Sequence, residues 1–452
     1  MALIEAIRYE DWMLNLTEVK LLHPDRPTGR PHETTLITGQ NGSHKSSLLR
    51  QLVSREVRPR EPDMFLTEKE AAANRLRHQV FCLSGSAADR FPSKEMPGGG
   101  HSHFDVPHYT YVGQRVANNL LSRKAPLERM LEFALHPRSR ERCAWSFFSD
   151  AHAFAGIKPN SEYRLVAKGL NSESRFKLNN LVSQLRSLTP DDDHARNRNR
   201  QFPYVSFAMA EWLLAEFNED DFRGLEQLIG AGRWDVQLSA SGATCDGASP
   251  SLLRLGMHLG ILRLQSATVH SVTHGASFSG FELSSGEFHM FSTILAIGFG
   301  LDADALLLLD EPENSLHPQW QRDLMSSILE VCGKVMKGGH VIVCTHSPLI
   351  VGAALEGSTV VDMSTREPHV TLVPYGASSD ELLLRQFGVA SSRNSVVVDK
   401  VQQAVALVER GNFDHPEFLA LLPDLAGIKA ALRSDDPMVD IIDSLMGEGE
   451  SR

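Results

Sequence analysis

Short apolar runs bounded by turn residues recur in the first and last parts of the chain, and each run predicts a buried strand. Helical periodicity separates several of these runs, so strands and helices alternate after residue 279. Such alternation is typical of a mainly parallel sheet covered by helices. The expected strands span residues 4–9, 19–22, 34–38, 79–83, 109–112, 305–309, 340–345, 359–362 and 370–373. One helix is expected to begin near residue 45, and two others are expected at residues 287–298 and 318–331.

The middle of the chain has a different pattern of polar and apolar residues. Residues 115–279 are charged and mostly helical in pattern, with one expected strand at residues 163–167. Sustained heptads are missing, which argues against a long coiled-coil arm. We therefore expect an α/β head made of residues 1–114 and 280–375, with antiparallel N-terminal strands. A largely helical insertion at residues 115–279 and a helical C-terminal segment at residues 376–452 complete the expected organisation.

The composition fits a soluble globular protein. Of 452 residues, 42% are hydrophobic and 22% are charged, and the net charge is −11. This charge gives no overall attraction to nucleic acid, although arginine clusters at residues 138–142 and 196–200 leave a local contact open. No apolar stretch reaches the length of a membrane span, and the charged N-terminus does not resemble a signal peptide. We expect a cytoplasmic protein without membrane insertion.

The strongest candidate for chemistry is TTLITGQNGSHKSSLL, where a buried strand runs into a glycine-rich loop and a helix. Gly39 permits the sharp turn, Lys45 places a cation near phosphate oxygens, and Ser46 offers a hydroxyl to Mg²⁺. His44 stands where a second glycine is expected, but its position near the helix start allows the required backbone angles. The pattern predicts a site for ATP and Mg²⁺ formed by Gly39, Asn41, Gly42, Ser43, His44, Lys45, Ser46 and Ser47.

A second candidate, ALLLLDEPENSLHP, is a buried strand that ends in two adjacent acids. Ligands of open α/β sheets bind at the carboxyl ends of the strands, so these acids are expected at the same edge as the glycine-rich loop. Asp310 would hold Mg²⁺, and Glu311 would polarise a water in line with the γ-phosphate. A third run, VIVCTHSP, predicts a strand that ends at His346, from which the ring can donate to the γ-phosphate.

These three motifs, together with FELSSGEFHMF, resemble the ABC ATPase superfamily over about half of the chain. The resemblance implies an ABC-type P-loop head in which Ser284, Ser285 and Gly286 clamp the nucleotide of a second subunit through a helix N-terminus. It therefore implies a homodimer or a higher homo-oligomer. Glu287 stands where the family commonly has glutamine.

Two weaker correspondences follow from the same resemblance. The Gln114 side chain, directly after the strand in YTYVGQR, would contact Mg²⁺ or the attacking water. Residues 314–317 match the loop that crosses the dimer, although His317 replaces the usual aspartate.

The long segment between Lys45 and Leu283 favours the soluble branch of the superfamily. That branch includes SMC-like, RecF-like and OLD-like ATPases and the AAA-type ABC ATPases of bacterial defence operons. The resemblance implies a nucleotide-gated switch or sensor in antiphage defence or DNA repair, with an effector protein encoded nearby. A C-terminal nuclease of the OLD-like type is not expected, because only about a hundred residues follow His346 and the sole candidate acidic cluster, Asp435 and Asp436, lies in a helical stretch.

Other interpretations stay open. The chain could be the energising subunit of a membrane transporter, or a scaffold that binds ATP with little turnover, since His44 departs from the phosphate-loop pattern. His101, His103 and His108 are zinc-ligand types but lack a placed fourth ligand. Trp212 and Phe217 lie at helical spacing and are expected in the core rather than on a base-stacking surface.

Overall fold

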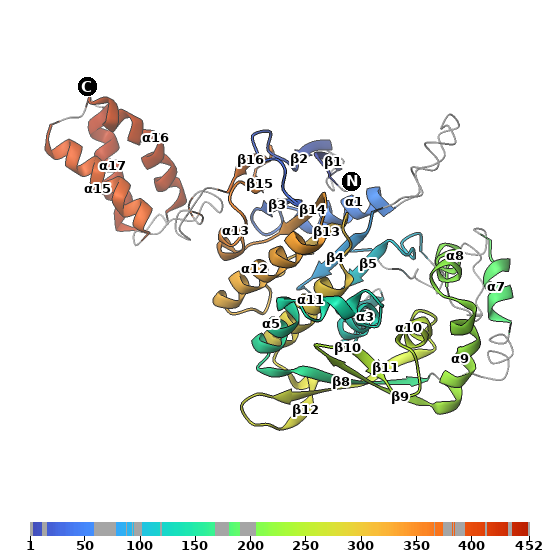
Figure 1. Cartoon of the computed structure of the whole chain (residues 1–452). Coiled ribbons are helices and arrows are strands. Elements are labelled where there is room, and N and C mark those ends of the chain that lie inside the picture. The colour runs from blue at the N-terminus through green and yellow to red at the C-terminus, as the bar shows by residue number, and fades with distance from the viewer. Residues whose placement is uncertain are drawn as a thin grey trace, which may run out of the picture.

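A computed structural model of the chain describes residues 3–10, 16–57, 78–86, 88–92, 94, 102–117, 120–167, 180–189, 205–365, 367–373, 382, 384, 394–411, 414–432 and 436–450. His101 and the arginine cluster at residues 196–200 lie outside these residues. Figure 1 shows an α/β head in the middle, the insertion below it, and a group of C-terminal helices to one side.

A seven-stranded sheet forms the head, in the order β16-β15-β3-β14-β13-β4-β5. All neighbouring pairs are parallel except β15 and β16, so the mainly parallel sheet expected from the sequence is confirmed. Every strand expected in this sheet is present to within a residue or two. The strands are β3 (His32–Thr38), β4 (Val80–Ser84), β5 (Tyr109–Val112), β13 (Leu306–Asp310), β14 (Gly339–Cys344), β15 (Thr359–Asp362) and β16 (His369–Leu372).

The central strands are buried on both faces, because alternate side chains enter two different hydrophobic clusters. Leu306 and Leu308 pack with α1 (Lys45–Val57) and with the antiparallel hairpin of β1 (Ala6–Glu10) and β2 (Leu16–Lys20). Leu307 and Leu309 pack on the other face with α11 (Ser285–Gly300) and α12 (Pro318–Val335). A short helix, α13 (Pro348–Gly352), follows β14. The helices expected near residue 45 and at 287–298 and 318–331 are thus confirmed.

The insertion differs from the expectation, because a five-stranded antiparallel sheet runs through it in the order β10-β9-β8-β11-β12. Only the second half of β8, residues 163–167, was predicted from the sequence. Its helices are α3 (Ala125–Ala134), α4 (Ser139–Arg142), α5 (Ser146–Phe154), α7 (Leu181–Ser187), α8 (Phe207–Glu216), α9 (Glu219–Ala231) and α10 (Pro250–His258). Its strands are β8 (Ile157–Ala167), β9 (Arg233–Ser239), β10 (Gly242–Cys245), β11 (Leu262–Ser271) and β12 (Ser277–Ser279), beside a small hairpin of β6 (Arg115–Ala117) and β7 (Leu120–Leu121).

A bulge explains why β11 was missed. Leu262 and Leu264 are buried, and after a register shift between Leu264 and Ser266 the buried positions become Ala267 and Val269. The shift moves the apolar residues from even to odd positions, so the strand has no continuous period of two in the sequence.

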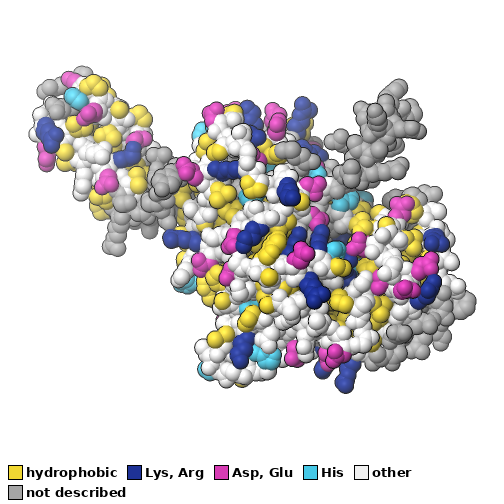
Figure 2. Space-filling view, viewed as in Figure 1, with side chains coloured by type: hydrophobic (Ala, Val, Ile, Leu, Met, Phe, Trp, Pro, Cys, Tyr) yellow, Lys and Arg dark blue, Asp and Glu magenta, His cyan; other side chains and the backbone are white. Residues whose placement is uncertain are grey.

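The insertion and the head share one hydrophobic core. Residues of α3, α5 and β8 belong to the same buried cluster as α11 and α12. By contrast, the C-terminal helices α15 (Ser395–Glu409), α16 (Pro416–Ala431) and α17 (Pro437–Glu450) have a cluster of their own. Figure 1 shows this bundle apart from the head, and Figure 2 shows the same arrangement in a space-filling view. Among the described helices, none is both long and apolar enough to span a bilayer.

The packing contact between Gly298 of α11 and Phe147 of α5 provides a test of this shared core. A Cβ at Gly298 would overlap the ring of Phe147, so Gly298→Ala should lower the free energy of unfolding by about 1–3 kcal/mol. Gly333 of α12 is the matched control, because nothing lies within 4 Å of a Cβ placed there. Gly333→Ala should raise the free energy of unfolding by about 0.5–1 kcal/mol. Urea denaturation of both variants measures the difference, and equal midpoints would contradict the shared core.

Candidate nucleotide-binding site

The carboxyl ends of the central parallel strands bring the candidate motifs to one edge of the sheet. Asp310 pairs in register with Cys344 of β14 and with Ser84 of β4. Cys344 in turn pairs with Ile37 of β3, two residues before the glycine-rich loop. The residues that follow β3, β13 and β14 therefore emerge at the same level, although they are far apart in the sequence.

The glycine-rich loop has a backbone that few residues other than glycine adopt. Gly39, Gly42 and His44 have φ angles of 144°, 85° and 66°, all in the left-handed region. A Cβ at Gly39 would also lie 2.7 Å from the Ser43 hydroxyl oxygen, so a larger residue does not fit there. His44 occupies the angles that a glycine would adopt, as expected, and histidine is among the residues that tolerate this region. The departure from the usual sequence therefore leaves the loop geometry in place.

Lys45 folds back across the loop that precedes it. Its Nζ donates to the carbonyl oxygens of Gly39 at 3.0 Å and Gln40 at 3.3 Å, and only 4% of the residue is exposed. Burial lowers the pKa of Lys45, while Glu311 and Asp310 raise it. The ammonium is thus held over the loop by dipoles rather than by a close ion pair, and it can turn toward an anion bound at the N-terminus of α1.

Ser46 and Asp310 join the two halves of the site. The Ser46 hydroxyl donates to Asp310 Oδ1 at 3.0 Å, across 264 positions of sequence. Asp310 lies on the same face of β13 as Leu306 and Leu308, which is the face covered by α1, so the alternation along the strand produces this contact. Burial raises the pKa of Asp310 to about 7, against the Ser46 hydrogen bond and Lys45, which lower it.

The donor set suits Mg²⁺. A carboxylate and a hydroxyl are hard oxygen ligands, and Mg²⁺ sites at phosphates commonly use one or two protein ligands with waters completing the shell. Among the described residues no group of three His, Cys, Asp or Glu side chains could hold a metal by itself, so His103 and His108 form no such group. The Ser46–Asp310 pair fits a cation that the nucleotide helps to bind.

Glu311 reaches the same edge because the strand ends before it. Its φ of 48° turns the chain at the position where regular alternation would send the side chain to the opposite face. Glu311 Oε2 accepts from Asn314 Nδ2 at 2.8 Å, and Oε1 lies 3.7 Å from His346 Nε2. Burial and Lys45 lower the pKa of His346, against Glu311. A neutral His346 beside Glu311 can donate one proton to a phosphate oxygen.

Two residues that support this turn were not identified from the sequence. The buried Glu313 accepts from the Thr345 hydroxyl and from the His346 N–H, both at 2.7 Å, and so fixes the end of β14 relative to β13. Gly85 packs so closely that a Cβ there would overlap the Glu311 carbonyl oxygen. Two local patterns in the sequence could have indicated these roles: Glu313 is the third acid of DEPEN, and Gly85 directly follows a buried strand.

The Ser47 hydroxyl has a partner that no motif indicated. Arg90 donates to Ser47 Oγ at 2.8 Å from the segment after β4, next to the buried carboxylate of Asp89. This arginine adds a cation beside the phosphate loop.

The serines of LSSGE lie at the N-terminus of α11 and are exposed. Ser284 caps this helix, and its N–H donates to Glu287 Oε2 at 2.8 Å in a reciprocal capping box. A Cβ at Gly286 would lie 3.0 Å from the Ser315 carbonyl oxygen, so α11 approaches the loop after β13 closely. No hydrogen bond between described residues joins these serines to the phosphate loop of the same chain.

The remaining candidates are placed less tightly. Gln114 follows β5 and is exposed, and within the described part of the chain its side chain makes no hydrogen bond. Gln114 lies at the carboxyl edge of the sheet, as expected, but no contact between described residues joins it to Asp310 or Glu311. His317 caps α12, where its Nδ1 accepts from the N–H of Gln319. Trp212 and Phe217 pack against the core as expected.

Comparison with known proteins agrees with this geometry. Residues 131–352 match the family model described as "AAA domain, putative AbiEii toxin, Type IV TA system". Over that stretch, the chain is similar to AAA-type P-loop ATPases. The match contains the Ser284 helix, the two acids and His346, whereas the phosphate loop lies before it.

The other comparisons add little. No curated protein matches the chain. One matching solved structure is described as "An inward-facing conformation of a putative metal-chelate type ABC transporter". It has 13% sequence identity, with 86% of this chain and 90% of that chain covered, at a TM-score of 0.29. A likeness of this size carries no argument about fold or function.

The backbone at His44 gives a test of the phosphate loop. His44→Gly should keep the affinity for ATP within about threefold, because glycine adopts the left-handed angles without strain. His44→Val should weaken ATP binding about tenfold, because a β-branched residue is disfavoured at a φ of 66° and would distort the loop. Equilibrium titration with ATP measures both affinities. Equal affinities of the glycine and valine variants would show that this loop does not bind the phosphates.

Proposed function

We propose that the protein binds ATP with Mg²⁺ and hydrolyses it, acting as a dimeric, nucleotide-gated switch. The observation that carries this proposal is the Ser46–Asp310 hydrogen bond of 3.0 Å, with Lys45 and Glu311 at the same edge of the sheet. A hydroxyl, a buried carboxylate, a poised ammonium and a second carboxylate are the groups that phosphoryl transfer to water needs. The similarity of residues 131–352 to AAA-type ATPases supports the proposal.

Each residue has a separate role in this scheme. The backbone N–H groups after Gly39 and the Lys45 ammonium bind the β- and γ-phosphates. Ser46 and Asp310 would hold Mg²⁺, which neutralises charge on the phosphates when bound. Glu311, positioned by Asn314, accepts a proton from the attacking water, and His346 donates to a γ-phosphate oxygen. Gln114 would contact Mg²⁺ or the water once the nucleotide is bound.

The second subunit enters through Ser284, Ser285 and Gly286. The two serines are exposed at the N-terminus of α11, and no contact in the chain itself uses them at the phosphate loop. A helix N-terminus with free N–H groups attracts an anion, and the γ-phosphate bound by another copy supplies one. We therefore propose a homodimer with two composite sites, and a higher homo-oligomer would need other surfaces.

A role in antiphage defence or DNA repair with a partner effector fits these features. The description of the matching family refers to a toxin of a type IV toxin–antitoxin system, which supports the defence side of this proposal. The head and the insertion share a core, so closure of the dimer would move the insertion as well. The proposed setting is the cytoplasm, where an effector or a nucleic acid would contact the insertion or the helical bundle.

Two other functions make different demands. A scaffold with little turnover is motivated only by the presence of histidine at position 44, where glycine is expected, and a steady-state ATPase assay separates it from an active ATPase. A transporter subunit would co-purify with a membrane protein.

The first test concerns Glu311. Glu311→Gln keeps the shape of the side chain and an acceptor for Asn314 but removes the base, so ATP binding should persist while turnover falls by about 10²–10⁴. Glu356→Gln, at an exposed carboxylate outside this edge, is the matched control and should hydrolyse ATP at the wild-type rate. Steady-state phosphate release and ATP titration measure both effects. Near-wild-type turnover of Glu311→Gln would remove this residue from the mechanism.

The second test concerns the composite site. Ser284→Arg places a bulky cation where the partner's phosphate must dock, so turnover should fall about 10²-fold or more while ATP binding to the monomer persists. Mixing it with Lys45→Ala should restore up to half of the wild-type activity per dimer, because one intact phosphate loop then faces one intact helix N-terminus.

The control for this experiment is Ser249→Arg, which removes an equivalent helix cap from α10. It should keep wild-type turnover if the effect at Ser284 is not simply the loss of a cap. A tagged pull-down with ATP shows whether the mixed dimers form. Wild-type hydrolysis by monomeric Ser284→Arg would exclude a shared site.

A further inference from the structure

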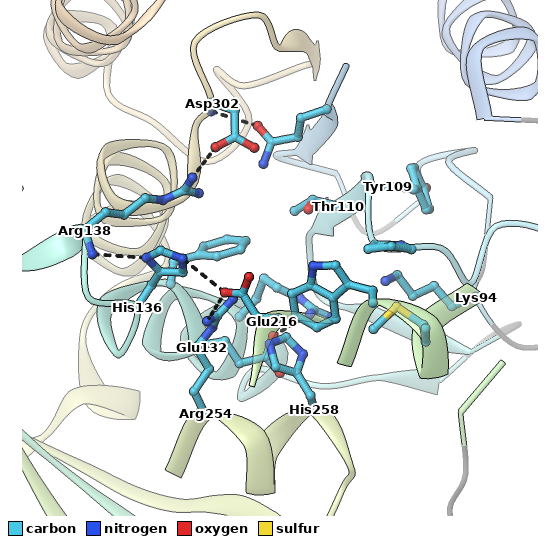
Figure 3. Close-up of a pocket in the computed structure, with 16 residues that line it drawn as sticks. Lys94, Tyr109, Thr110, Glu132, His136, Arg138, Glu216, Arg254, His258 and Asp302 are labelled. Carbon is cyan, nitrogen blue, oxygen red and sulfur yellow. Dashed lines mark hydrogen bonds and ion pairs between the residues drawn. The ribbon is translucent and has the colours of Figure 1, made fainter. Parts of the chain in front are cut away.

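Two adjoining cavities lie beside the edge strand β5, between the head and the insertion. Their volumes are about 180 and 220 Å³, and both are lined by Lys94, Arg129 and Glu132. The first cavity, drawn in Figure 3, also contacts Gln79, Thr110 and Asp302. These three residues lie at or before the amino ends of β4, β5 and β13, so the cavity is at the opposite edge of the sheet from the phosphate loop.

Most charges in the first cavity are already paired. Arg254 donates to Glu216 at 2.6 Å, and Arg138 pairs with Asp302. Figure 3 marks both contacts with dashed lines. Burial lowers the pKa of His136 and of His258 to about 4, so both rings are neutral at pH 7. Each carboxylate of this wall therefore has an arginine partner before any ligand arrives.

Lys94 is the surplus cation. Among the described residues it has no ion pair, although Arg129 beside it pairs with Glu132. Figure 3 shows the Lys94 side chain directed into the cavity without a dashed line. Burial and Arg129 lower the pKa of Lys94 to about 8, so most of the ammonium groups carry their charge at pH 7. Asp105 and Glu132 act on this half-buried cation only through space, so an anion that contacts it directly would be stabilised.

The cavities offer further polar groups. The Nε2 atom of His258 is buried and has no hydrogen-bond partner in the described structure. The second cavity adds Arg115, which pairs with the buried Asp89 at 2.9 Å, and Arg263, which lies 3.9 Å from Glu128. Across both cavities the basic side chains thus outnumber the acidic ones, in a chain whose net charge is −11.

We propose that these adjoining cavities form a binding site for a small phosphorylated ligand, whose phosphate lies between Lys94 and Arg129. The arginine supplies a planar fork and the lysine supplies a compact charge, a combination that suits the several oxygens of a phosphate. The remainder of the ligand would extend along β5 into the second cavity. The phosphate position between Lys94 and Arg129 is separate from the proposed nucleotide site and does not depend on ATP hydrolysis, whereas the second cavity extends to Gly113 and Arg115, on either side of Gln114.

Inorganic phosphate is the probe for the first experiment. It is titrated into full-length Lys45→Ala protein, in which the phosphate loop lacks its cation, against sodium chloride at equal ionic strength. The fluorescence of Trp212 reports binding, because this ring lines the first cavity and contacts His258 with ring centroids 4.9 Å apart. Loss of the signal in Trp212→Phe assigns it to this residue. Calorimetry gives an independent dissociation constant.

Lys94→Met is the decisive variant, made in the same Lys45→Ala background. It removes a cation that has no ion-pair partner, so its unfolding temperature should not fall. Phosphate binding should weaken at least about tenfold, as for the loss of one charge-assisted contact. Lys158→Met, at an exposed lysine of β8, is the matched control and should bind phosphate unchanged.

The outcomes separate the possibilities. Saturable phosphate binding that depends on Lys94, with acetate binding more weakly, supports the site. Titration with ribose 5-phosphate then distinguishes a phosphorylated compound from free phosphate, since contacts in the second cavity should tighten its binding and Arg263→Gln should remove that gain. No saturable binding, or equal phosphate affinity of Lys94→Met and Lys158→Met, would overturn the proposal.

Discussion

The parallel register of β3, β14, β13 and β4 is the constraint on which the nucleotide site depends. Asp310 is level with Cys344 and Ser84, and its side chain shares the face of β13 that α1 covers. A slip of one residue would turn Asp310 to the opposite face and remove its contact with Ser46. The leucines of β13 do not by themselves oppose such a slip, because both faces of the strand pack into hydrophobic clusters. The backbone at the end of the strand does, since the Glu311 N–H donates to the Cys344 carbonyl oxygen at 2.9 Å and the Gly85 N–H donates to the Asp310 carbonyl oxygen at 3.1 Å. Hydrogen bonds to both neighbouring strands therefore fix the position of the proposed magnesium ligand.

At the carboxyl edge of this sheet, Asp310 and Lys45 are two ionisable groups that are held away from water. Burial raises the pKa of Asp310 to about 7 and lowers the pKa of Lys45, so the surroundings of each group disfavour its charged form. An Mg²⁺–nucleotide complex brings a cation to the first and an anion to the second. In this scheme, binding of the complex favours the charged forms of Asp310 and Lys45. The turn after β13 is already fixed before the ligand arrives, because Asn314 and Glu313 hold it by hydrogen bonds.

The insertion is bound to the head more closely than a separate domain would be. One hydrophobic cluster runs from α11 and α12 through α3 and α5 to β8, and Gly298 allows the ring of Phe147 to pack against α11. Because Ser284 caps α11, the proposed contact with a second subunit lies at one end of the helix that packs against the insertion. The first cavity at Lys94 lies where the edge strand β5 meets α3, α8 and α10 of the insertion. Among the described residues, α15, α16 and α17 form a separate hydrophobic cluster.

The sequence by itself determined the local motifs and the class of fold. Continuous apolar runs predict buried strands, and the order strand, glycine-rich loop and Lys45 predicts a phosphate loop, because short-range sterics and backbone donors decide these features. Only the tertiary structure decided the strand order, the antiparallel sheet of the insertion, the roles of Glu313 and Gly85, and the cavities around Lys94. A bulge concealed β11 by changing the parity of its buried positions. The cavities join side chains from residue 79 to residue 302, and their unpaired charge depends on three-dimensional neighbours that no local pattern contains.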